Sequence, residues 1–566
     1  MSIGGKAQLR ASWSWWDPWF LSAGIVALLV GTPILVVLSS LVTPSFDIWA
    51  HLWETQLLEL IWNTLILIVG VGLGVLVLGI GLAWLVTMYR FPGRGIFEWL
   101  LILPLAIPAY VIGFVFLAIF DYAGPVQSWL RAWLGPEIWF PDFSSYGGVT
   151  LVMTLVLYPY VYMLARTAFL EQAAGTLEAA RSLGAGALVV FWKVALPLAR
   201  PSITAGLAFA VMEALADFGT VAIFGYSTFT VAIYRVWYGL FDRAAATELA
   251  SILMLFALGL YLMERMARGH ARFDQTQGTV RPTLAKRLYG WKAWAASGVA
   301  ALVIGVAFVL PVFQLLVWVV GSAEYDVSYR ELLFNTLMLG GVTAIIAVVA
   351  AVVIAYGLRL SRHWIIPAFA RVASMGYALP GSVIAVGVLV PLAFLDHTLD
   401  EFLRSTWGIS SGLLLTGSMV ALVFAYLVRF LAVSLHTVEA SLVKVTPNMD
   451  MAGRSLGVGK GGVLWRIHLP LIRGGLSAGA VLVFVDVMKE MPATLLLRPF
   501  GYDTLAVRVW QLTSESFWEA AALPALTIVA AGILPVMLLV AGTTREFSAR
   551  TDRVRMDSSA PVVTSP

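Results

Sequence analysis

Long apolar runs dominate this chain of 566 residues and restrict what it can fold into. About twenty apolar residues cross a bilayer as a helix. Because 60% of the residues are hydrophobic and only 12% are charged, the chain lacks the polar surface of a globular protein, which is about 25% charged. We therefore expect an all-α polytopic membrane protein of about 12 transmembrane helices. The predicted spans lie near residues 20–42, 58–88, 97–120, 146–169, 201–224, 245–263, 293–320, 332–358, 364–394, 411–437, 474–497 and 519–542.

The basic residues predict the orientation, since Lys and Arg gather in cytoplasmic loops. Most of the 36 basic residues lie in the termini and in one alternating set of loops. The opposite loops hold only Arg131, Arg235, Arg243, Arg330, Arg404, Arg498 and Arg508. Both termini are therefore predicted to be cytoplasmic. The N-terminus lacks a small-residue cleavage site after a short apolar core, so no removable signal peptide is expected.

The chain repeats itself at an offset of 272–273 residues, which indicates an internal duplication. Asn63–Leu65 matches Asn335–Leu337, and Arg181–Gly184 matches Arg454–Gly457. Each half carries six predicted spans, so the repeat is parallel and the halves are related by an axis along the membrane normal. The predicted domains are a cytoplasmic or interfacial N-terminus (1–19), a first transmembrane domain (20–264), a cytoplasmic linker (265–292), a second transmembrane domain (293–544) and a disordered cytoplasmic tail (545–566).

A motif with fixed spacing stands in the predicted cytoplasmic loop at about residues 171–200. Its anchors are Glu178, Ala179, Ala180, Gly184, Leu196 and Pro197. Small residues at 179 and 180 allow another surface to approach closely, Gly184 is expected to turn the chain, and Pro197 is expected to begin a new segment. The second half repeats the motif at Gly457, Leu469 and Pro470, in a loop at about 438–473.

This pattern resembles the EAA motif of type I ABC importer permeases, the inner membrane components of binding-protein-dependent transport. The resemblance implies that each motif forms a coupling helix seated in an ATP-hydrolysing subunit, of which two copies are expected. It also implies a periplasmic or lipid-anchored solute-binding protein and a multi-pass location in the bacterial inner membrane. The second copy departs from the motif, because Met451 replaces the glutamate and Asp450 stands one position early. We expect the two coupling helices to bind the ATPase unequally.

Several chemistries are excluded by the sequence itself. The chain has no cysteine, and it contains neither a G-x-x-x-x-G-K-[ST] phosphate loop nor an H-E-x-x-H zinc motif. We therefore expect no catalytic residue and no cofactor on this chain, with ATP and Mg on the partner ATPase. An ion-coupled secondary transporter with twelve spans remains an alternative of another class, although it does not explain two coupling motifs.

Four acidic residues fall inside predicted spans, where ionisable groups are costly and usually functional or paired. They are Glu213, Asp217, Asp486 and Glu490. The i, i+4 spacing of each pair predicts one helix face, and carboxylates of this kind suit a hard cation along a solute path. The alternative is that these carboxylates pair with Arg429, Lys489 or helix ends and only hold the bundle together.

The resemblance extends to segments typical of fused ferric-iron importer permeases. These are Asp217–Phe224, Thr230–Arg235, Lys489–Pro499 and Asp503–Arg508. They imply ferric iron as the solute, with no metal ligands fixed in advance. Thiamine, polyamine and phosphonate permeases have related segments and remain alternatives within the same class.

Overall fold

The computed structural model describes residues 18–42, 44, 46–172, 179–180, 182–268, 285–321, 328–360, 363–443 and 445–538. Among these residues, eleven helices are long and apolar enough to cross a membrane. The twelfth predicted span corresponds to a shorter apolar helix, Ala522–Leu538. Most of the predicted N-terminal segment, most of the linker and the whole predicted tail lie outside the described residues. The prediction of an all-α polytopic membrane protein is confirmed.

The helices group into two compact units, each assembled from separate stretches of chain. Unit 1 comprises residues 1–55, 232–257 and 330–507. Its elements are α1 (Pro18–Ser39), α2 (Phe46–Thr55), the end of α12 (Phe229–Gly239), most of α13 (Arg243–Arg268), α16 (Tyr329–Leu360), α17 (Ile366–Met375), η4 (Gly376–Ala378), α18 (Gly381–Trp407), α19 (Met419–Leu442), α20 (Pro447–Ser455), α21 (Lys460–Val463), η5 (Leu464–His468), α22 (Leu469–Lys489), α23 (Pro492–Leu497) and the start of α24 (Leu505–Ser514).

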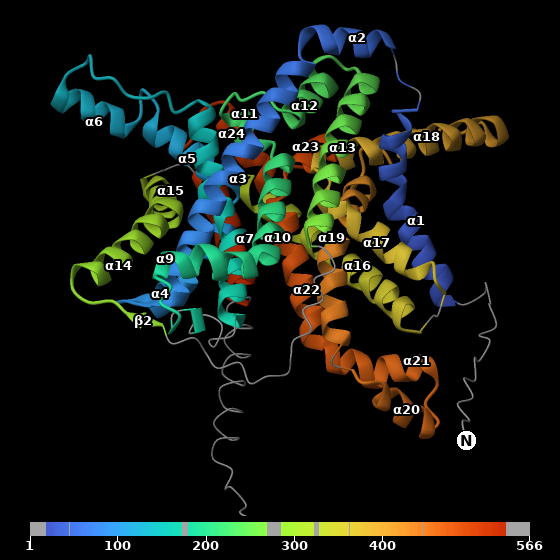
Figure 1. The fold of residues 1–566 in the computed structure, drawn as a ribbon. Helices are drawn as coiled ribbons and strands as arrows, with labels where there is room; N and C mark the ends of the chain where they lie inside the picture. Colours follow the sequence, from blue (N-terminus) through green and yellow to red (C-terminus); the bar gives the residue numbers. More distant parts are fainter. Residues whose placement is uncertain are drawn as a thin grey trace, which may run out of the picture. The chain divides into compact units, whose positions relative to one another are not determined.

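Within unit 1, α19 packs along α22, and α1 packs along α17 and α18 (Figure 1). The face that α1 presents to this unit is lined by the buried side chains of Ala23, Ala27 and Val30. A side chain on Gly387 of α18 would overlap the Pro33 carbonyl of α1. The N-terminal helix is therefore seated closely on helices of the second sequence half.

Unit 2 comprises residues 56–231, 258–329 and 508–566. Its elements are α3 (Leu57–Met88), β1 (Tyr89–Arg90), α4 (Arg94–Leu100), η1 (Leu103–Ala106), α5 (Ala109–Phe120), α6 (Pro125–Leu134), α7 (Tyr146–Glu171), α9 (Ala187–Val190), η2 (Phe191–Ala195), α10 (Leu196–Ala216), α11 (Gly219–Ile223), β2 (Lys286–Arg287), α14 (Trp291–Ile304), η3 (Gly305–Val309) and α15 (Leu310–Gly321). Helices α3, α7 and α10 form its centre.

In unit 2, the first helices of the second half pack on the first half. Helix α14 contacts α4, and α15 contacts α5. The ring of Trp318 in α15 stacks on that of Phe114 in α5. The parallel pair of β1 and β2 and a hydrogen bond from Ser297 to the Pro92 carbonyl fix the start of α14. Each unit thus takes its first membrane helix from the other sequence half. The predicted domains, 20–264 and 293–544, follow the repeat in the sequence. The two compact units in the structure differ from them, because each unit combines stretches from both halves.

The duplicated Asn-Thr-Leu segments have the same role in both units. The side chain of Asn63 donates to the Ser227 carbonyl, and the Tyr226 hydroxyl donates back to the Asn63 carbonyl. Unit 1 has the same reciprocal pair of bonds. The side chain of Asn335 donates to the Asp503 carbonyl, and the Tyr502 hydroxyl donates to the Asn335 carbonyl. Each asparagine therefore fixes the loop that follows a short helix deep in its unit.

The prolines of the two motifs do not break their helices. Pro197 lies inside one continuous helical span, Ala187–Ala216, and Pro470 lies inside Gly461–Lys489. In each case a π-helical turn, η2 or η5, ends just before the Leu-Pro pair. Proline has no N–H, and its ring crowds the carbonyl four residues back. A wider turn relieves that crowding. As expected, the segment α10 begins here with Pro197 in its first turn, but it follows the π-turn without a break in the helical span.

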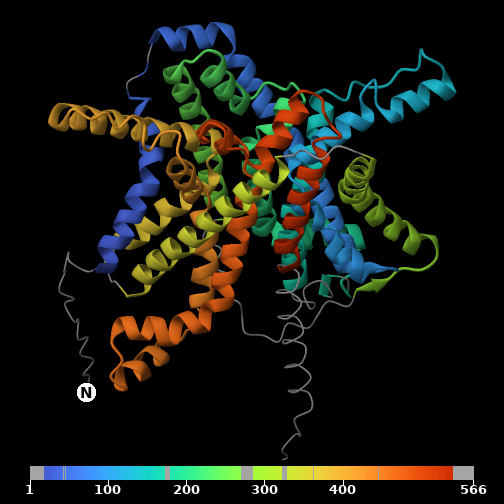
Figure 2. The same ribbon diagram turned by 180° about the vertical axis from the view of Figure 1, so that it is seen from behind.

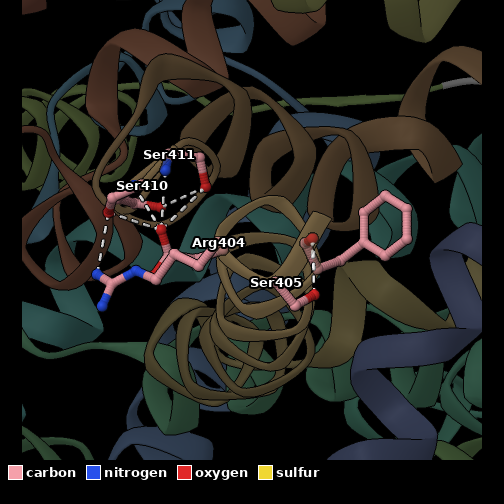
Figure 3. Close-up of polar contacts among 7 residues, drawn as sticks. Arg404, Ser405, Ser410 and Ser411 are labelled. Atoms are coloured by element: carbon pink, nitrogen blue, oxygen red, sulfur yellow. Dashed lines mark hydrogen bonds and ion pairs between the residues drawn. The ribbon is translucent and has the colours of Figure 1, made fainter. Parts of the chain in front are cut away.

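The long helix α18 ends in a loop that its own carboxylates hold. Asp396 accepts hydrogen bonds from the amides of Leu415 and Thr416 at 2.9 and 2.7 Å. One turn later, Asp400 accepts from the hydroxyl of Ser410 at 2.8 Å and pairs with Arg404, whose Nε lies 2.7 Å away. Figure 3 shows Arg404, Ser410 and Ser411 gathered at this place. Both carboxylates are therefore used within the loop.

Candidate coupling loops and intramembrane carboxylates

The glycine of each motif makes the turn that the sequence predicts. Gly184 has φ +85° and Gly457 has φ +78°, a region that side chains other than glycine rarely adopt. In the first copy, the Ala185 amide donates to the Ala180 carbonyl at 3.1 Å. In the second copy, the bond from Val458 to Gly453 has the same spacing, at 3.0 Å. A bond over five residues with glycine in the left-handed conformation is the Schellman ending of a helix.

The residue before each glycine is a large, exposed apolar side chain. Leu183 is 88% exposed and Leu456 is 82% exposed. The tryptophans at matching repeat positions, Trp192 and Trp465, are also exposed. The same pair of large apolar side chains is exposed in both copies. Exposed apolar groups of this kind mark a surface that binds a partner. The motif anchors did not single out these residues, although Leu183 lies within the repeated Arg-Ser-Leu-Gly stretch.

The remaining motif positions are placed as follows. Glu178 lies outside the described residues. Ala179 is exposed and Ala180 is half-buried. Leu196 and Leu469 begin α10 and α22, and their amides close the π-turns by donating to the carbonyls five residues back.

The second copy is tied to its membrane helices by a polar network. Nη2 of Arg359, at the end of α16, lies 2.9 Å from Oδ2 of Asp450 in α20. The same guanidinium donates to the Leu442 and Val445 carbonyls at 3.3 and 3.0 Å. The other carboxylate oxygen of Asp450 bonds Nε2 of the buried His468. Figure 2 shows α20 and α21 beyond the end of α22.

The electrostatics of this network keep Asp450 ionised. Burial by itself would raise the pKa of the Asp450 carboxyl, but hydrogen bonds from Arg359 and His468 outweigh it and hold the pKa below its usual value. The ionised carboxylate accepts the Nε2 hydrogen of His468, so Nδ1 accepts the hydrogen of the Tyr356 hydroxyl. Tyr356, His468 and Asp450 are thus joined in one chain of hydrogen bonds, which Arg359 enters through Asp450.

The first copy is built differently at the matching positions. Trp84, the counterpart of Tyr356, packs edge-on against Phe169 and Phe191, with ring centroids 5.3 and 4.8 Å apart. The counterpart of His468 is Ala195, whose carbonyl accepts from the buried side chain of Gln172 at 2.8 Å. Among the described residues at these positions, the first copy therefore shows aromatic packing and a neutral hydrogen bond where the second copy has charged groups.

Two of the four intramembrane carboxylates cap helices. Both Asp217 and Glu490 follow the last helical residue and have extended backbones, so the expected i, i+4 pairs on one helix face are wrong. Asp217 accepts from the Thr220 and Val221 amides at 3.0 and 3.1 Å. Glu490 accepts from the Ala493 amide at 3.1 Å. Free amides at the start of a helix attract a carboxylate, and this capping ends the preceding helix.

Glu490 also forms a buried ion pair within unit 1. Its Oε2 lies 3.3 Å from Nε of Arg429 in α19, and the two side chains are only 5% and 9% exposed. Gly381, at the start of α18, is so close that a Cβ there would overlap both charged groups. The alternative reading is therefore confirmed for Glu490, which pairs with Arg429 and caps a helix. For Asp217, the pairing with a helix end is confirmed.

The other two carboxylates lie within their helices. Glu213 in α10 and Asp486 in α22 are half-buried. The part of the chain that the structure describes contains no group of three His, Asp or Glu side chains arranged to hold a metal ion. Glu213 and Asp486 are thus the candidates that capping does not account for.

Comparison with known proteins decides the family. A family model described as "Binding-protein-dependent transport system inner membrane component" matches residues 75–272, which include the first motif. The sulfate transport system permease protein CysT of Synechococcus elongatus is 30% identical over 272 residues, covering 47% of this chain and 95% of that protein. The chain belongs to this family. It is therefore the ABC-type permease component of a binding-protein-dependent transport system, and a multi-pass membrane protein.

Two further relatives match a larger share of the permease than the CysT relative does. The Fe(3+)-transport system permease protein FbpB 2 of Haemophilus influenzae is 28% identical over 527 residues, covering 91% of this chain and 97% of that protein. The ferric transport system permease protein FbpB of Actinobacillus pleuropneumoniae is 22% identical over 421 residues, covering 70% of this chain and 58% of that protein. A match of 527 residues spans both halves of the permease, whereas the CysT relative has the length of one half.

Proposed function

We propose that the permease forms the membrane path of an ATP-driven importer for ferric iron. The supporting observation is the relative named as an Fe(3+)-transport permease, which matches over nearly its whole length and over both halves of this chain. Ferric iron is the solute in this proposal, so no resident metal site on the chain is required. Sulfate is the second candidate, because a sulfate permease relative is 30% identical over one half. Thiamine, polyamine and phosphonate remain possible solutes of the same class.

The proposal includes the partners and the orientation. Two copies of an ATPase subunit would bind ATP and Mg and seat on the two coupling loops, and a solute-binding protein would dock on the opposite face. We assign the exposed Leu183 and Leu456 as apolar contacts of the ATPase. Glu178, Ala179 and Ala180 of the first motif are assigned to the same contact, and Asp450 belongs to the second coupling loop. The excess of basic residues in the termini and their set of loops supports a cytoplasmic location for both termini in this proposal.

Uptake in cells tests the class and the solute together. Cells carrying the permease with its ATPase and binding protein should accumulate radiolabelled ferric iron in an energy-dependent way. Unlabelled sulfate, thiamine, spermidine and 2-aminoethylphosphonate should not compete. Accumulation of radiolabelled sulfate without iron would replace the solute and keep the importer. Uptake that persists without the ATPase and follows an ion gradient would instead support a secondary transporter.

We further propose that Glu213 and Asp486 contact the solute during passage, while Asp217 and Glu490 hold the path in shape. The double variant Glu213→Gln with Asp486→Asn should lower iron uptake by about tenfold or more, because two carboxylates leave a path built for a hard cation. Amounts of assembled complex should stay at the wild-type level, since neither side chain caps a helix. Loss of the folded permease, or unchanged uptake, would assign both residues to structure.

A further inference from the structure

Three side chains connect α20 with two membrane helices in unit 1. Arg359 belongs to the last turn of α16, Asp450 to α20, and His468 to the π-turn that leads into α22. Asp450 touches both of the others through different carboxylate oxygens. Arg359 in addition holds the C-terminal carbonyl of α19 at Leu442. The Asp450 carboxylate therefore joins α20 to α16 and to the turn that leads into α22, and Arg359 extends the network to the end of α19.

We propose that Arg359, Asp450 and His468 are positioning residues that carry the movement of the second coupling loop to α16 and α22. Asp450 replaces the motif glutamate at a neighbouring position, but its carboxylate is turned into its own unit. The motif acid of the second copy thereby acts inside the permease, between the ATPase contact and the membrane helices.

The two sides of α20 support this division of roles. On the outer side, Met451 is 58% exposed and Leu456 is 82% exposed. On the inner side, Gly453 is buried, and a Cβ at this position would press on Ile467 and Val463. The inner side of α20 is therefore tightly packed and is held by the ion pair of Asp450 with Arg359. A partner that pushes on the outer side would move α20 together with the helices on its inner side. Charge-assisted bonds of this kind are directional and roughly twice as strong as neutral ones.

The first copy shows what the network adds. At the same repeat positions, unit 2 has Trp84 and Ala195, and Thr87 stands where unit 1 has Arg359. The Thr87 hydroxyl donates within its own helix, to the Ala83 and Trp84 carbonyls at 2.7 and 3.3 Å. Apolar packing can slide, whereas an ion pair with fixed partners transmits a displacement in a set direction. At the described positions, the ion pair of Arg359 with Asp450 is thus particular to the second copy.

Variants of Asp450 test the assignment in the assembled complex of permease, ATPase and binding protein in lipid vesicles. Asp450→Asn keeps the size of the side chain and removes its charge. Solute transported per ATP hydrolysed should fall about fivefold or more, the lower end of typical coupling between two sites. Asp450→Glu, which keeps the charge, should restore most of it. The matched control is Asp400→Asn, since Asp400 is also paired with an arginine and is similarly covered, at 18% exposed against 19% for Asp450.

The readouts separate this inference from the proposed function on which it rests. A wild-type complex without ATP-driven transport would refute the importer itself. If the wild-type complex transports and Asp450→Asn transports equally per ATP, the positioning role is refuted. If Asp450→Asn does not assemble, the Arg359→Gln complex decides, because this change removes the other charge of the same pair. A transport yield per ATP below wild type supports positioning, and a wild-type yield refutes the inference.

Discussion

Replacing Arg429 by methionine should lower the free energy of unfolding of the permease by about 3–5 kcal/mol, because it leaves the carboxylate of Glu490 buried without its partner. The pair is nearly excluded from water, with the two side chains 9% and 5% exposed. Glu490 also caps α23 through the Ala493 amide, so a displaced carboxylate would loosen the start of that helix as well. Thermal or denaturant unfolding of the purified permease in detergent measures the effect.

A double-variant cycle separates the ion pair from general packing. The variant that combines Arg429→Met with Glu490→Gln should recover part of the loss, since no charge is then left unpaired. Arg404→Met is the matched control, because Arg404 is 63% exposed in its pair with Asp400, and exposed pairs contribute about 0–1 kcal/mol. If Arg429→Met costs no more than Arg404→Met, the pair does not stabilise the unit.

The sequence was sufficient for the features that repeat or that depend on local chemistry. Apolar runs predicted the membrane helices because their length is set by the bilayer. The glycines at 184 and 457 were predicted as turns because few other residues accept a positive φ, and both have it. The family followed from the spacing of motif anchors in two copies, and the comparisons confirm it.

Features that depend on distant partners were not predictable. Nothing in an apolar run says which unit its helix joins, so the exchange of the first helices could not be read from hydropathy. Asp450 and Arg359 are 91 residues apart, and Arg429 and Glu490 are 61 apart. Lys489, adjacent to Glu490, was the nearer candidate by position alone. The carboxylates at 217 and 490 were expected on helix faces because the pattern does not show where a helix ends within an apolar span.

The π-turns before Pro197 and Pro470 mark a second limit of sequence reasoning. A proline in an apolar run predicts a break or a kink, and only the surrounding packing decides how the helix adapts. The wide turn keeps the helix continuous from the coupling loop into the membrane. In each copy, the short helix and its glycine turn stand just ahead of that continuous helix. The glycine turn is therefore the place where a change in the backbone should reach transport directly.

Replacing both Gly184 and Gly457 by valine should reduce solute transport by roughly thirty- to several-hundredfold. Each turn then needs a left-handed conformation that costs about 1–2 kcal/mol in a residue with a Cβ, and about 1.4 kcal/mol is a factor of ten. Apart from the chain neighbours, no atom of the described residues lies within 4 Å of a Cβ built at either position, so within the permease the expected effect is strain in the backbone. Replacement of both glycines by asparagine is the matched control, since asparagine tolerates this conformation. Transport per assembled complex should be nearly normal in the asparagine variant, and equal transport by the valine variant would show that the turns are not needed for coupling.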